Sequence, residues 1–218
     1  MLCAPRWLDD TGGLVLPKIG VLGGSFNPVH VGHLILAQDA MEHFELDEVV
    51  LVPCRNPPHK PFNLLAPAAH RLAMLEAVAE EDPRFSVSDL ELLRNGPSYT
   101  IDTVEQLMLF RPLDDIHFII GSDSLTELAS WHRVGDLLDL CPLLVVVRPG
   151  FGAQALSRRD LGLPEAWAGR LIENMVEGHM VQISASDIRM RIAEGMSIRY
   201  LVPPPVEMYI AEHGLYTA

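Results

Sequence analysis

The amino-acid sequence predicts an α/β domain whose sheet is doubly wound and mostly parallel. Short runs rich in Val, Ile and Leu recur along the chain, at residues 18–22, 49–53, 116–120 and 143–147. Amphipathic stretches lie between these runs, at residues 32–44, 67–80 and 100–110. Compact apolar runs suit strands that are buried on both faces, and their alternation with helices indicates βαβ units.

The two ends of the chain are less regular. Residues 150–178 contain many turn formers and are expected to wrap the surface between two strands. A short strand at 181–183, a helix at 186–194 closed by Gly195 and a last helix at 206–213 are expected to follow. We expect residues 18–218 to form a single domain. Residues 1–17 are a leader of unknown role, for which a flexible segment, a short added strand and an upstream start-codon artefact all stay open.

Composition limits the classes of protein that fit. The chain has 218 residues, of which 49% are hydrophobic and 21% charged, so it can build a sizeable core. A formal net charge of −13 argues against a nucleic-acid or anionic-membrane surface, although local cations and backbone N–H groups can still bind an anionic substrate. Three widely spaced cysteines without a Cys-x-x-Cys motif indicate reduced thiols in a cytoplasmic protein. No signal peptide and no apolar run of roughly 20 residues, the length that spans a bilayer, is present.

A loop rich in glycine follows the first predicted strand. Gly23-Gly24-Ser25-Phe26-Asn27-Pro28 leads directly towards the predicted helix 32–44. Glycines let a backbone approach its ligand closely, and a helix amino terminus supplies N–H donors, so the pattern indicates phosphate binding. The loop has neither Gly-Lys-Ser/Thr nor Gly-x-Gly-x-x-Gly, so a Walker A loop and a simple dinucleotide loop are not predicted.

Two histidines, His30 and His33, stand three residues apart where this helix begins, so both can face one side. Imidazole N–H groups can donate to phosphoryl oxygens, which suits transfer through a charge-rich transition state. A structural pair that caps the helix and a zinc-binding pair remain open at this point. The zinc interpretation needs a third ligand, and no Asp/Glu/His cluster in the sequence offers one, so no protein-bound metal is predicted.

Residues 23–33, which we call the glycine-histidine loop, resemble a signature of the nucleotidyltransferase superfamily that includes bacterial nicotinate-nucleotide adenylyltransferase. That signature carries His-x-Gly-His after the first strand. Ile183-Ser184-Ala185-Ser186-Asp187-Ile188-Arg189 resembles the second signature, Ile-Ser-x-Thr-x-x-Arg, with Ser186 in place of Thr. Asn27 stands where many members have Asp. The resemblance implies a Rossmann-like nucleotidyltransferase fold, with ligands at the carboxyl ends of the strands beside the topological switch point.

Further stretches resemble the nicotinate branch of the superfamily in order and spacing. They are Pro57-Pro58-His59-Lys60, Pro97-Ser98-Tyr99-Thr100, Ile119-Ile120-Gly121-Ser122-Asp123-Ser124-Leu125, Trp131 and Val147-Arg148-Pro149-Gly150. Together with the two signatures, they extend the resemblance over nearly all of the chain from Gly20 onward. The parts outside it are residues 1–17 and the middle of 150–178.

The resemblance implies two sets of site residues. The set for ATP is Gly23, Gly24, Ser25, Phe26, His30, His33, Gly121, Asp123, Ser184, Ser186 and Arg189. The set for nicotinate mononucleotide is Ser25, Lys60, Ser98, Tyr99, Thr100, Asp123, Trp131, His132 and Arg148. His30, His33 and Arg189 are the implied catalytic residues.

Chemistry supports these implied roles. Two hydroxyls at a helix start with Arg189 one turn in can hold departing phosphates. Trp131 offers a flat face to a pyridine ring, backbone N–H groups near Thr100 and after Trp131 suit a carboxylate, and Asp123 suits a ribose hydroxyl. Taken alone, each has a plainer interpretation. Trp131 would be a core aromatic, Ser98, Thr100 and Asp123 would be helix caps, and Lys60 would be a solvated cation. His70 and Arg71 fall within the predicted helix 67–80 and are expected to be surface groups.

The implied reaction joins ATP and nicotinate mononucleotide into nicotinate adenine dinucleotide, releasing pyrophosphate, in NAD biosynthesis. Mg²⁺ would accompany ATP with few protein ligands. Both partners are small molecules, without nucleic acid or membrane, and a homo-oligomer is left open. Two alternatives are a transferase of the same superfamily acting on another substrate, such as phosphopantetheine, and a nucleotide-sensing module that has kept the fold without catalysis.

Overall fold

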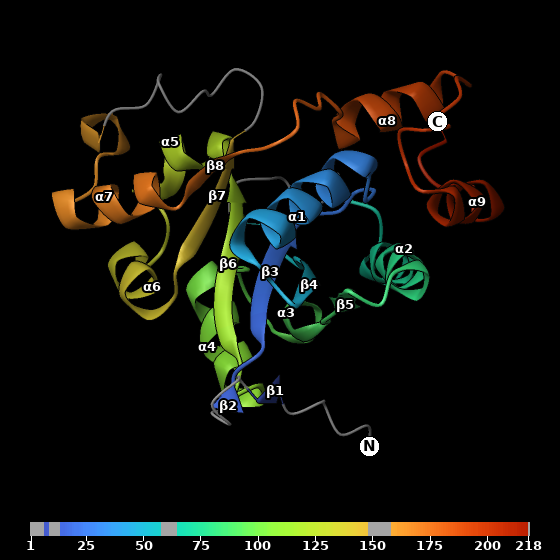
Figure 1. Cartoon of the computed structure of the whole chain (residues 1–218). Helices are drawn as coiled ribbons and strands as arrows, with labels where there is room; N and C mark the ends of the chain where they lie inside the picture. Colours follow the sequence, from blue (N-terminus) through green and yellow to red (C-terminus); the bar gives the residue numbers. More distant parts are fainter. Residues whose placement is uncertain (1–6, 9–13, 58–64, 148–157, 218) are drawn as a thin grey trace.

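Six parallel strands form the central sheet of the protein (Figure 1). The structure is a computed structural model that describes residues 7–8, 14–57, 65–147 and 158–217. In spatial order the strands are β5 (Phe85–Val87), β4 (Glu48–Pro53), β3 (Lys18–Gly24), β6 (Asp115–Gly121), β7 (Leu143–Val147) and β8 (Met175–Glu177). Every neighbouring pair runs parallel, so the predicted doubly wound α/β fold is confirmed.

Both faces of this sheet are buried, as the apolar runs predicted. In β4, Val49 and Leu51 belong to the core on one face, whereas Val50 and Val52 belong to the core on the other. All four side chains are at most 3% exposed. Successive strand side chains point to opposite faces, so a strand covered on both sides needs an unbroken apolar run rather than an alternating one.

Two groups of helices supply that cover. On one face lie α1 (Val31–Phe44), α2 (Ala68–Glu81), α8 (Ala185–Ala193) and α9 (Pro204–Glu212). On the other lie α3 (Leu90–Leu93), α4 (Thr100–Phe110), α5 (Leu125–Leu128), α6 (Val134–Leu140) and α7 (Glu165–Glu173). The helices predicted at 32–44, 67–80, 100–110, 186–194 and 206–213 are present, each shifted by at most two residues at an end.

The chain changes direction across the sheet at β3. From β3 the chain passes through α1 to β4 and through α2 to β5, both on one side of β3. It then returns and places β6 on the other side of β3. The loops after β3 and β6 therefore leave the same edge of the sheet in opposite directions. This is the topological switch point, where open α/β sheets form their ligand crevice.

The last strand differs from its prediction. The strand expected at 181–183 is absent from the described residues there, and β8 lies instead at Met175–Glu177, inside the segment that was expected to wrap the surface. The reason is a tertiary contact: the His179 N–H donates to the Asp39 carboxylate at 2.7 Å, so the chain leaves the sheet before Val181. The described part of 150–178 also contains α7 and a 3₁₀ turn, Arg158–Leu161.

Part of the leader is also ordered. Trp7–Leu8 (β1) pairs antiparallel with Leu14–Val15 (β2), separate from the main sheet. This agrees with the short added strand that was one of three open interpretations. None of the helices in the described parts of the chain has the length and apolar character to cross a membrane.

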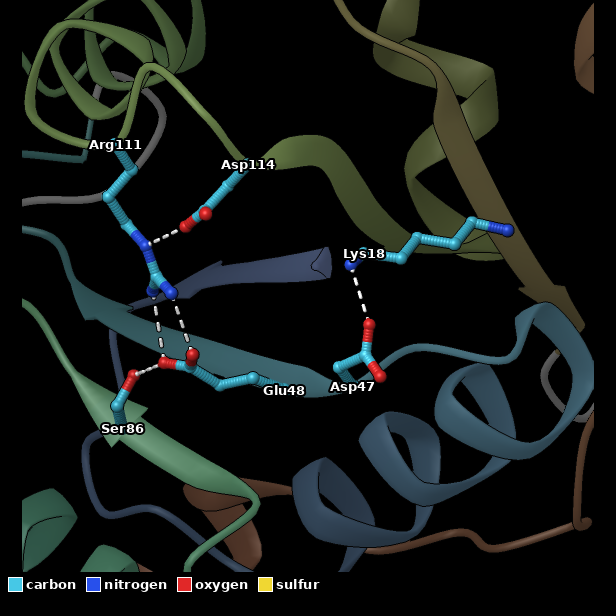
Figure 2. A network of polar contacts seen from close by, with 6 residues as sticks. All are labelled: Lys18, Asp47, Glu48, Ser86, Arg111 and Asp114. Atoms are coloured by element: carbon cyan, nitrogen blue, oxygen red, sulfur yellow. Dashed lines mark hydrogen bonds and ion pairs between the residues drawn. The ribbon is translucent and has the colours of Figure 1, made fainter. Parts of the chain in front are cut away.

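A polar network closes the amino-terminal edge of the sheet, away from the ligand crevice (Figure 2). Arg111, just after α4, forms a two-pronged ion pair with Glu48 at 2.8 and 3.0 Å and also contacts Asp114. Ser86 of β5 donates to the same Glu48 carboxylate. Burial alone would raise the pKa of Glu48, but the bonds from Arg111 and Ser86 outweigh it and hold that pKa below its ordinary value. The network thus ties α4, β4 and β5 together.

Candidate active site at the switch point

The glycine-histidine loop begins with the last two residues of β3, Gly23 and Gly24. The Gly24 carbonyl accepts from the Cys54 N–H at 2.9 Å, which holds the loop beside the end of β4. A Cβ on Gly24 would lie 3.2 Å from the Phe26 ring, and one on Gly23 would lie 3.1 Å from Phe118. Phe26 is buried and has a positive φ of 41°. Any larger residue at either position would therefore force an aromatic ring to shift, because aromatic side chains pack directly onto this backbone.

His30 and His33 come together at the start of α1. His30 is the N-cap residue and is 4% exposed. The two rings stack with centroids 3.7 Å apart, and Phe26 meets His33 edge-on at 5.0 Å. The His30 N–H donates to His33 Nδ1 at 3.2 Å, so a neutral His33 carries its hydrogen on Nε2. This ring can then donate a hydrogen bond from its outer nitrogen.

The geometry also bears on the alternatives for the pair. The helix-capping interpretation is partly right, because the two histidines form a capping box. The side chain of each lies by the backbone N–H of the other across the first helical turn. The zinc interpretation gains no support: no group of three or more potential metal ligands occurs among the described residues. A Cβ on Gly32 would lie 3.1 Å from His30 Nδ1, so a glycine at this position leaves room for the buried ring.

Arg71 supports the loop from below, which the sequence interpretation missed. It was taken for a surface group of α2, but it is 1% exposed. Its guanidinium donates to three carbonyls, those of Ser25 at 2.8 Å, Cys54 at 2.8 Å and Ala66 at 3.0 Å. Burial lowers the pKa of this guanidinium from its ordinary value, yet an arginine stays charged at neutral pH. Arg71 therefore places a positive charge directly beneath the glycine-histidine loop.

The second signature lies against the first. Ser184 is the N-cap of α8, and its hydroxyl accepts from the Asp187 N–H at 3.1 Å. Arg189 donates to the Asn27 carbonyl at 2.7 Å and to the Ser186 hydroxyl at 3.1 Å. Ser184 and Ser186 are exposed. The helix start that was predicted to bind an anion thus lies next to the glycine-histidine loop, and Arg189 joins the two.

Asn27 fixes the loop from its other side. Its side-chain oxygen accepts from the Ala66 N–H at 2.9 Å and from the Tyr216 hydroxyl at 3.0 Å. An amide oxygen accepts these bonds as well as a carboxylate would, so the departure from Asp noted above keeps this acceptor.

Gly121 and Asp123 lie at the carboxyl end of β6, the neighbour of β3. Gly121 ends the strand, and Asp123 is exposed within the short 3₁₀ turn Ser122–Ser124. The cap residues of this turn and of α5 are Gly121 and Ser124, so Asp123 is not the helix cap that was its plainer interpretation. Its carboxylate is thus placed at the switch point on the side opposite α1.

An aromatic group forms a second part of the site. Tyr99 and His132 stack with ring centroids 4.2 Å apart, and Tyr99 and Trp131 both pack on the core beneath α4 and α5. Trp131 is half-buried. Thr100 begins α4, whose cap residue Tyr99 makes no side-chain cap bond. The structure therefore brings Tyr99, Thr100, Trp131 and His132 together.

Ser98 has a structural task. Its hydroxyl accepts from the N–H groups of Arg55 at 3.1 Å and Asn56 at 3.2 Å, and its own N–H donates to the Asn56 carbonyl at 2.9 Å. Ser98 does not cap α4, which corrects the plainer interpretation. It ties the segment before α4 to the loop after β4. Lys60 and Arg148 lie outside the described residues.

Comparisons with known proteins agree with this architecture. The family model described as cytidylyltransferase-like matches residues 21–191. A protein of Trichlorobacter lovleyi named "Probable nicotinate-nucleotide adenylyltransferase" is 42% identical over 213 residues, covering 91% of this chain and 99% of that protein. A protein of Opitutus terrae with the same name is 44% identical over 200 residues, covering 91% and 97%.

A solved structure has the same fold. The Plasmodium falciparum nicotinic acid mononucleotide adenylyltransferase complexed with NaAD superposes with a TM-score of 0.71 at 20% identity. The match covers 92% of this chain and 97% of that one. The doubly wound sheet is therefore common to both.

Proposed function

This chain belongs to the cytidylyltransferase-like family and, within it, to the nicotinate-nucleotide adenylyltransferases, and we propose on that premise how its residues carry the reaction. The protein is a nucleotidyltransferase of NAD biosynthesis. It converts ATP and nicotinate mononucleotide into nicotinate adenine dinucleotide and pyrophosphate. The relatives carry the name of this activity, and a fold neighbour holds the product NaAD.

The chemical step needs no protein nucleophile. A phosphate oxygen of nicotinate mononucleotide is already ionised at neutral pH and attacks the α-phosphorus of ATP in line, while pyrophosphate leaves. The bond that forms is P–O, and the bond that breaks joins the α-phosphorus to the bridging oxygen of the leaving pyrophosphate. The task of the enzyme is to align two anions and offset their repulsion.

The glycine-histidine loop does this for ATP. His33 donates from Nε2, and His30 is fixed against it by stacking, so both rings stabilise the charge that develops on the transferred phosphoryl group. The backbone of Gly23, Gly24, Ser25 and Phe26 cradles the phosphates, with the buried charge of Arg71 beneath. This stacked pair at a helix start, joined by Arg189 to a second helix start, is the observation that carries the proposal.

The leaving pyrophosphate is held at the start of α8. Ser184, Ser186 and Arg189 offer two hydroxyls and a guanidinium within one turn, where the helix dipole also favours an anion. Gly121 and Asp123 complete the ATP side at the end of β6, with the Asp123 carboxylate accepting from a ribose hydroxyl.

Nicotinate mononucleotide occupies the aromatic part of the site. Its pyridine ring stacks on Trp131, near the Tyr99–His132 pair, and its carboxylate accepts from backbone N–H groups at the start of α4, by Thr100, and after Trp131. Ser98 shapes this corner through its bonds to Arg55 and Asn56. Lys60, Arg148, Ser25 and Asp123 complete the proposed contacts to its phosphate and ribose.

ATP would bind as its Mg²⁺ complex, in which the cation would offset the charge of the phosphates and keep much of its water, with few protein ligands. Of the side chains above, the Asp123 carboxylate would bind one of these water molecules. A cytoplasmic location completes the proposal.

The proposal is tested by measuring pyrophosphate release from ATP with each of three acceptors: nicotinate mononucleotide, nicotinamide mononucleotide and phosphopantetheine. We expect the highest kcat/KM with nicotinate mononucleotide. The highest value with phosphopantetheine would assign the chain to the other branch of the superfamily. Binding of ATP without turnover of any acceptor would favour the nucleotide-sensing alternative.

The same assay tests the place of the pyridine ring. Trp131→Ala removes the flat face proposed to stack on it, so the KM for nicotinate mononucleotide is expected to rise about tenfold or more, while the KM for ATP changes little. An equal rise in both KM values would remove Trp131 from the proposed substrate contact.

A further inference from the structure

Asp39 is a buried carboxylate on α1 that the proposed mechanism does not use. It is 3% exposed, and both of its oxygens are occupied by one residue of a distant segment. Asp39 Oδ1 lies 2.6 Å from His179 Nδ1, and Oδ2 accepts from the His179 N–H at 2.7 Å. Burying a carboxylate is costly unless its charge and lone pairs are matched, so this double contact is a specific feature of the fold.

The neighbouring residue shows how closely the chain is held. A Cβ on Gly178 would lie 2.5 Å from Val146, 2.8 Å from Asp39 Oδ2 and 3.3 Å from the Val147 carbonyl. No real side chain tolerates such distances without a shift of its surroundings. The chain after β8 is therefore pressed against α1 and the end of β7 at the point where Asp39 grips it.

The segment that follows, residues 178–184, leads directly to the proposed ATP site. Val181 and Ile183 line a small cavity together with His30 and Gly32. Ile183 also lies 3.6 Å from where a Cβ on Gly32 would stand. The next residue is Ser184, the cap of α8. The segment thus forms a wall of the space beside His30 and sets where α8 begins.

We propose that Asp39 is a positioning residue for ATP: by holding His179, it fixes segment 178–184 as a wall of the ATP site and sets the start of α8 against the glycine-histidine loop. The inference rests on the proposed function, because it uses ATP as the ligand of that site. Two contacts then position α8, one on each side of Ser184. They are the bond from Arg189 to Asn27 and the contact of Asp39 with His179.

The charge state of His179 supports this role. Its hydrogen bond to Asp39 raises the pKa of the imidazole, and the charges of Asp39 and Glu42 act in the same direction. The histidine side chain is 75% exposed, so it can carry its charge in contact with water while neutralising a carboxylate that is buried.

The first test changes the carboxylate. Asp39→Asn keeps the size of the side chain and one acceptor but removes the charge. Glu76→Gln makes the same change in size and charge at an exposed position of α2 and is the matched control. We expect the Kd of ATP, measured by calorimetry without a second substrate, to rise about tenfold in Asp39→Asn. The KM for nicotinate mononucleotide is expected to stay within about twofold in Asp39→Asn, and Glu76→Gln is expected to match the wild type in both quantities.

A second test uses exposed side chains, so that loss of folding does not obscure the result. His179→Asn keeps a donor near the position of Nδ1, whereas His179→Leu removes it. We expect His179→Leu to weaken ATP binding about fivefold and His179→Asn to restore it to within about twofold of the wild type. His43→Leu, at an exposed histidine of the same helix α1, is the matched control.

Two results would overturn the inference. One is an unchanged Kd for ATP in both Asp39→Asn and His179→Leu. The other is an equal loss of both substrates together with a lowered Tm, which would make Asp39 merely structural. Because the Kd of ATP is measured without turnover, a wild-type protein that binds ATP but forms no dinucleotide would contradict the proposed function and leave this test intact.

Discussion

His33 is the side chain on which the proposed chemistry depends most directly. Its ring is fixed by three contacts from two neighbours: the stacked His30 ring, the edge contact with Phe26 and the His30 N–H, which donates to Nδ1. A side chain held in this way does not have to reorganise when charge develops on the phosphoryl group, which is how preorganised donors accelerate a reaction.

Replacing His33 should therefore affect the chemical step and leave the fold intact. We expect His33→Ala to lower kcat about 100-fold or more, the loss typical when one preorganised donor is removed, with little change in Tm. His43→Ala, at an exposed position in the last turn of α1, is expected to match the wild type. Near-normal turnover in His33→Ala would remove the histidine from the mechanism.

Arg71 acts at the same scale but through the loop rather than the substrate. Its three carbonyl partners come from the loop itself, from the end of β4 and from the approach to α2. A clue to its burial existed in the sequence. Residues three, four and seven positions further on, Met74, Leu75 and Val78, are the buried stripe of α2, and Arg71 continues this stripe. Its charge alone led to the expectation of a surface position.

Arg71→Met should cost both stability and activity. The apolar side chain would leave three carbonyls, one buried and two partly buried, without this donor, so we expect the free energy of unfolding to fall by about 3 kcal/mol. Because the loop backbone also loses its support, kcat should fall more than in a surface variant. Arg84→Met, at an arginine whose side chain is 50% exposed, is the control and should change stability by less than about 0.5 kcal/mol. Equal stability of the two variants would contradict the account of Arg71.

At the scale of helices and strands, most of the fold could be predicted from the sequence. Four of the six strands, β3, β4, β6 and β7, were visible as apolar runs because both of their faces are buried. The other two, β5 and β8, have three residues each and lie at the sheet edges, so they are too short to show a period. The strand expected at 181–183 was wrong because a tertiary contact, Asp39 with His179, takes the chain off the sheet.

The candidate site could be predicted in its types of residue but not in its contacts. The glycine-histidine loop and Ser184 to Arg189 were found because consecutive residues of unusual type mark a strand-to-helix turn and a helix cap. The contacts that position these motifs were not predicted. They are made by Arg71, Ser98 and Asp39 with residues 17 to 140 positions away in the sequence. Periodicity and local motifs contain no information on pairings this distant.

The network at the other edge of the sheet gives a prediction for an element far from the chemistry. Arg111→Met should lower the free energy of unfolding by about 2 kcal/mol, since it leaves the partly buried Glu48 carboxylate without its main donor. The kcat and both KM values should stay near those of the wild type. Chemical denaturation and steady-state kinetics measure the two quantities.

The pH dependence of this effect has a definite sign. The pKa of Glu48 is lower in the folded protein than in the unfolded chain, where it is about 4.3. The pair therefore stabilises the fold fully above that value, and this contribution is lost as the pH falls through the lower folded pKa. The difference in stability between wild type and Arg111→Met should be constant at neutral pH and shrink on acidification. A difference that grows on acidification would refute the assignment.

For the whole molecule, the two faces of the sheet carry different parts of the proposed site. The face covered by α1, α2, α8 and α9 carries the glycine-histidine loop and the start of α8, which are assigned to ATP. The face covered by α3 to α7 carries Tyr99, Thr100, Trp131 and His132, which are assigned to nicotinate mononucleotide. In the proposed reaction, the two substrates meet above β3 and β6, where the direction in which successive strands are added to the sheet reverses.

The central claim is that the mononucleotide phosphate attacks the α-phosphorus of ATP at this crevice, and isotope labelling tests it most directly. The protein is incubated with nicotinate mononucleotide and with ATP labelled at either the α- or the γ-phosphate. We expect the α-label to appear in nicotinate adenine dinucleotide and the γ-label in pyrophosphate, in equal amounts, and His33→Ala to slow both together. Release of the γ-label as orthophosphate, or an α-label that stays in ADP or AMP, would contradict this claim.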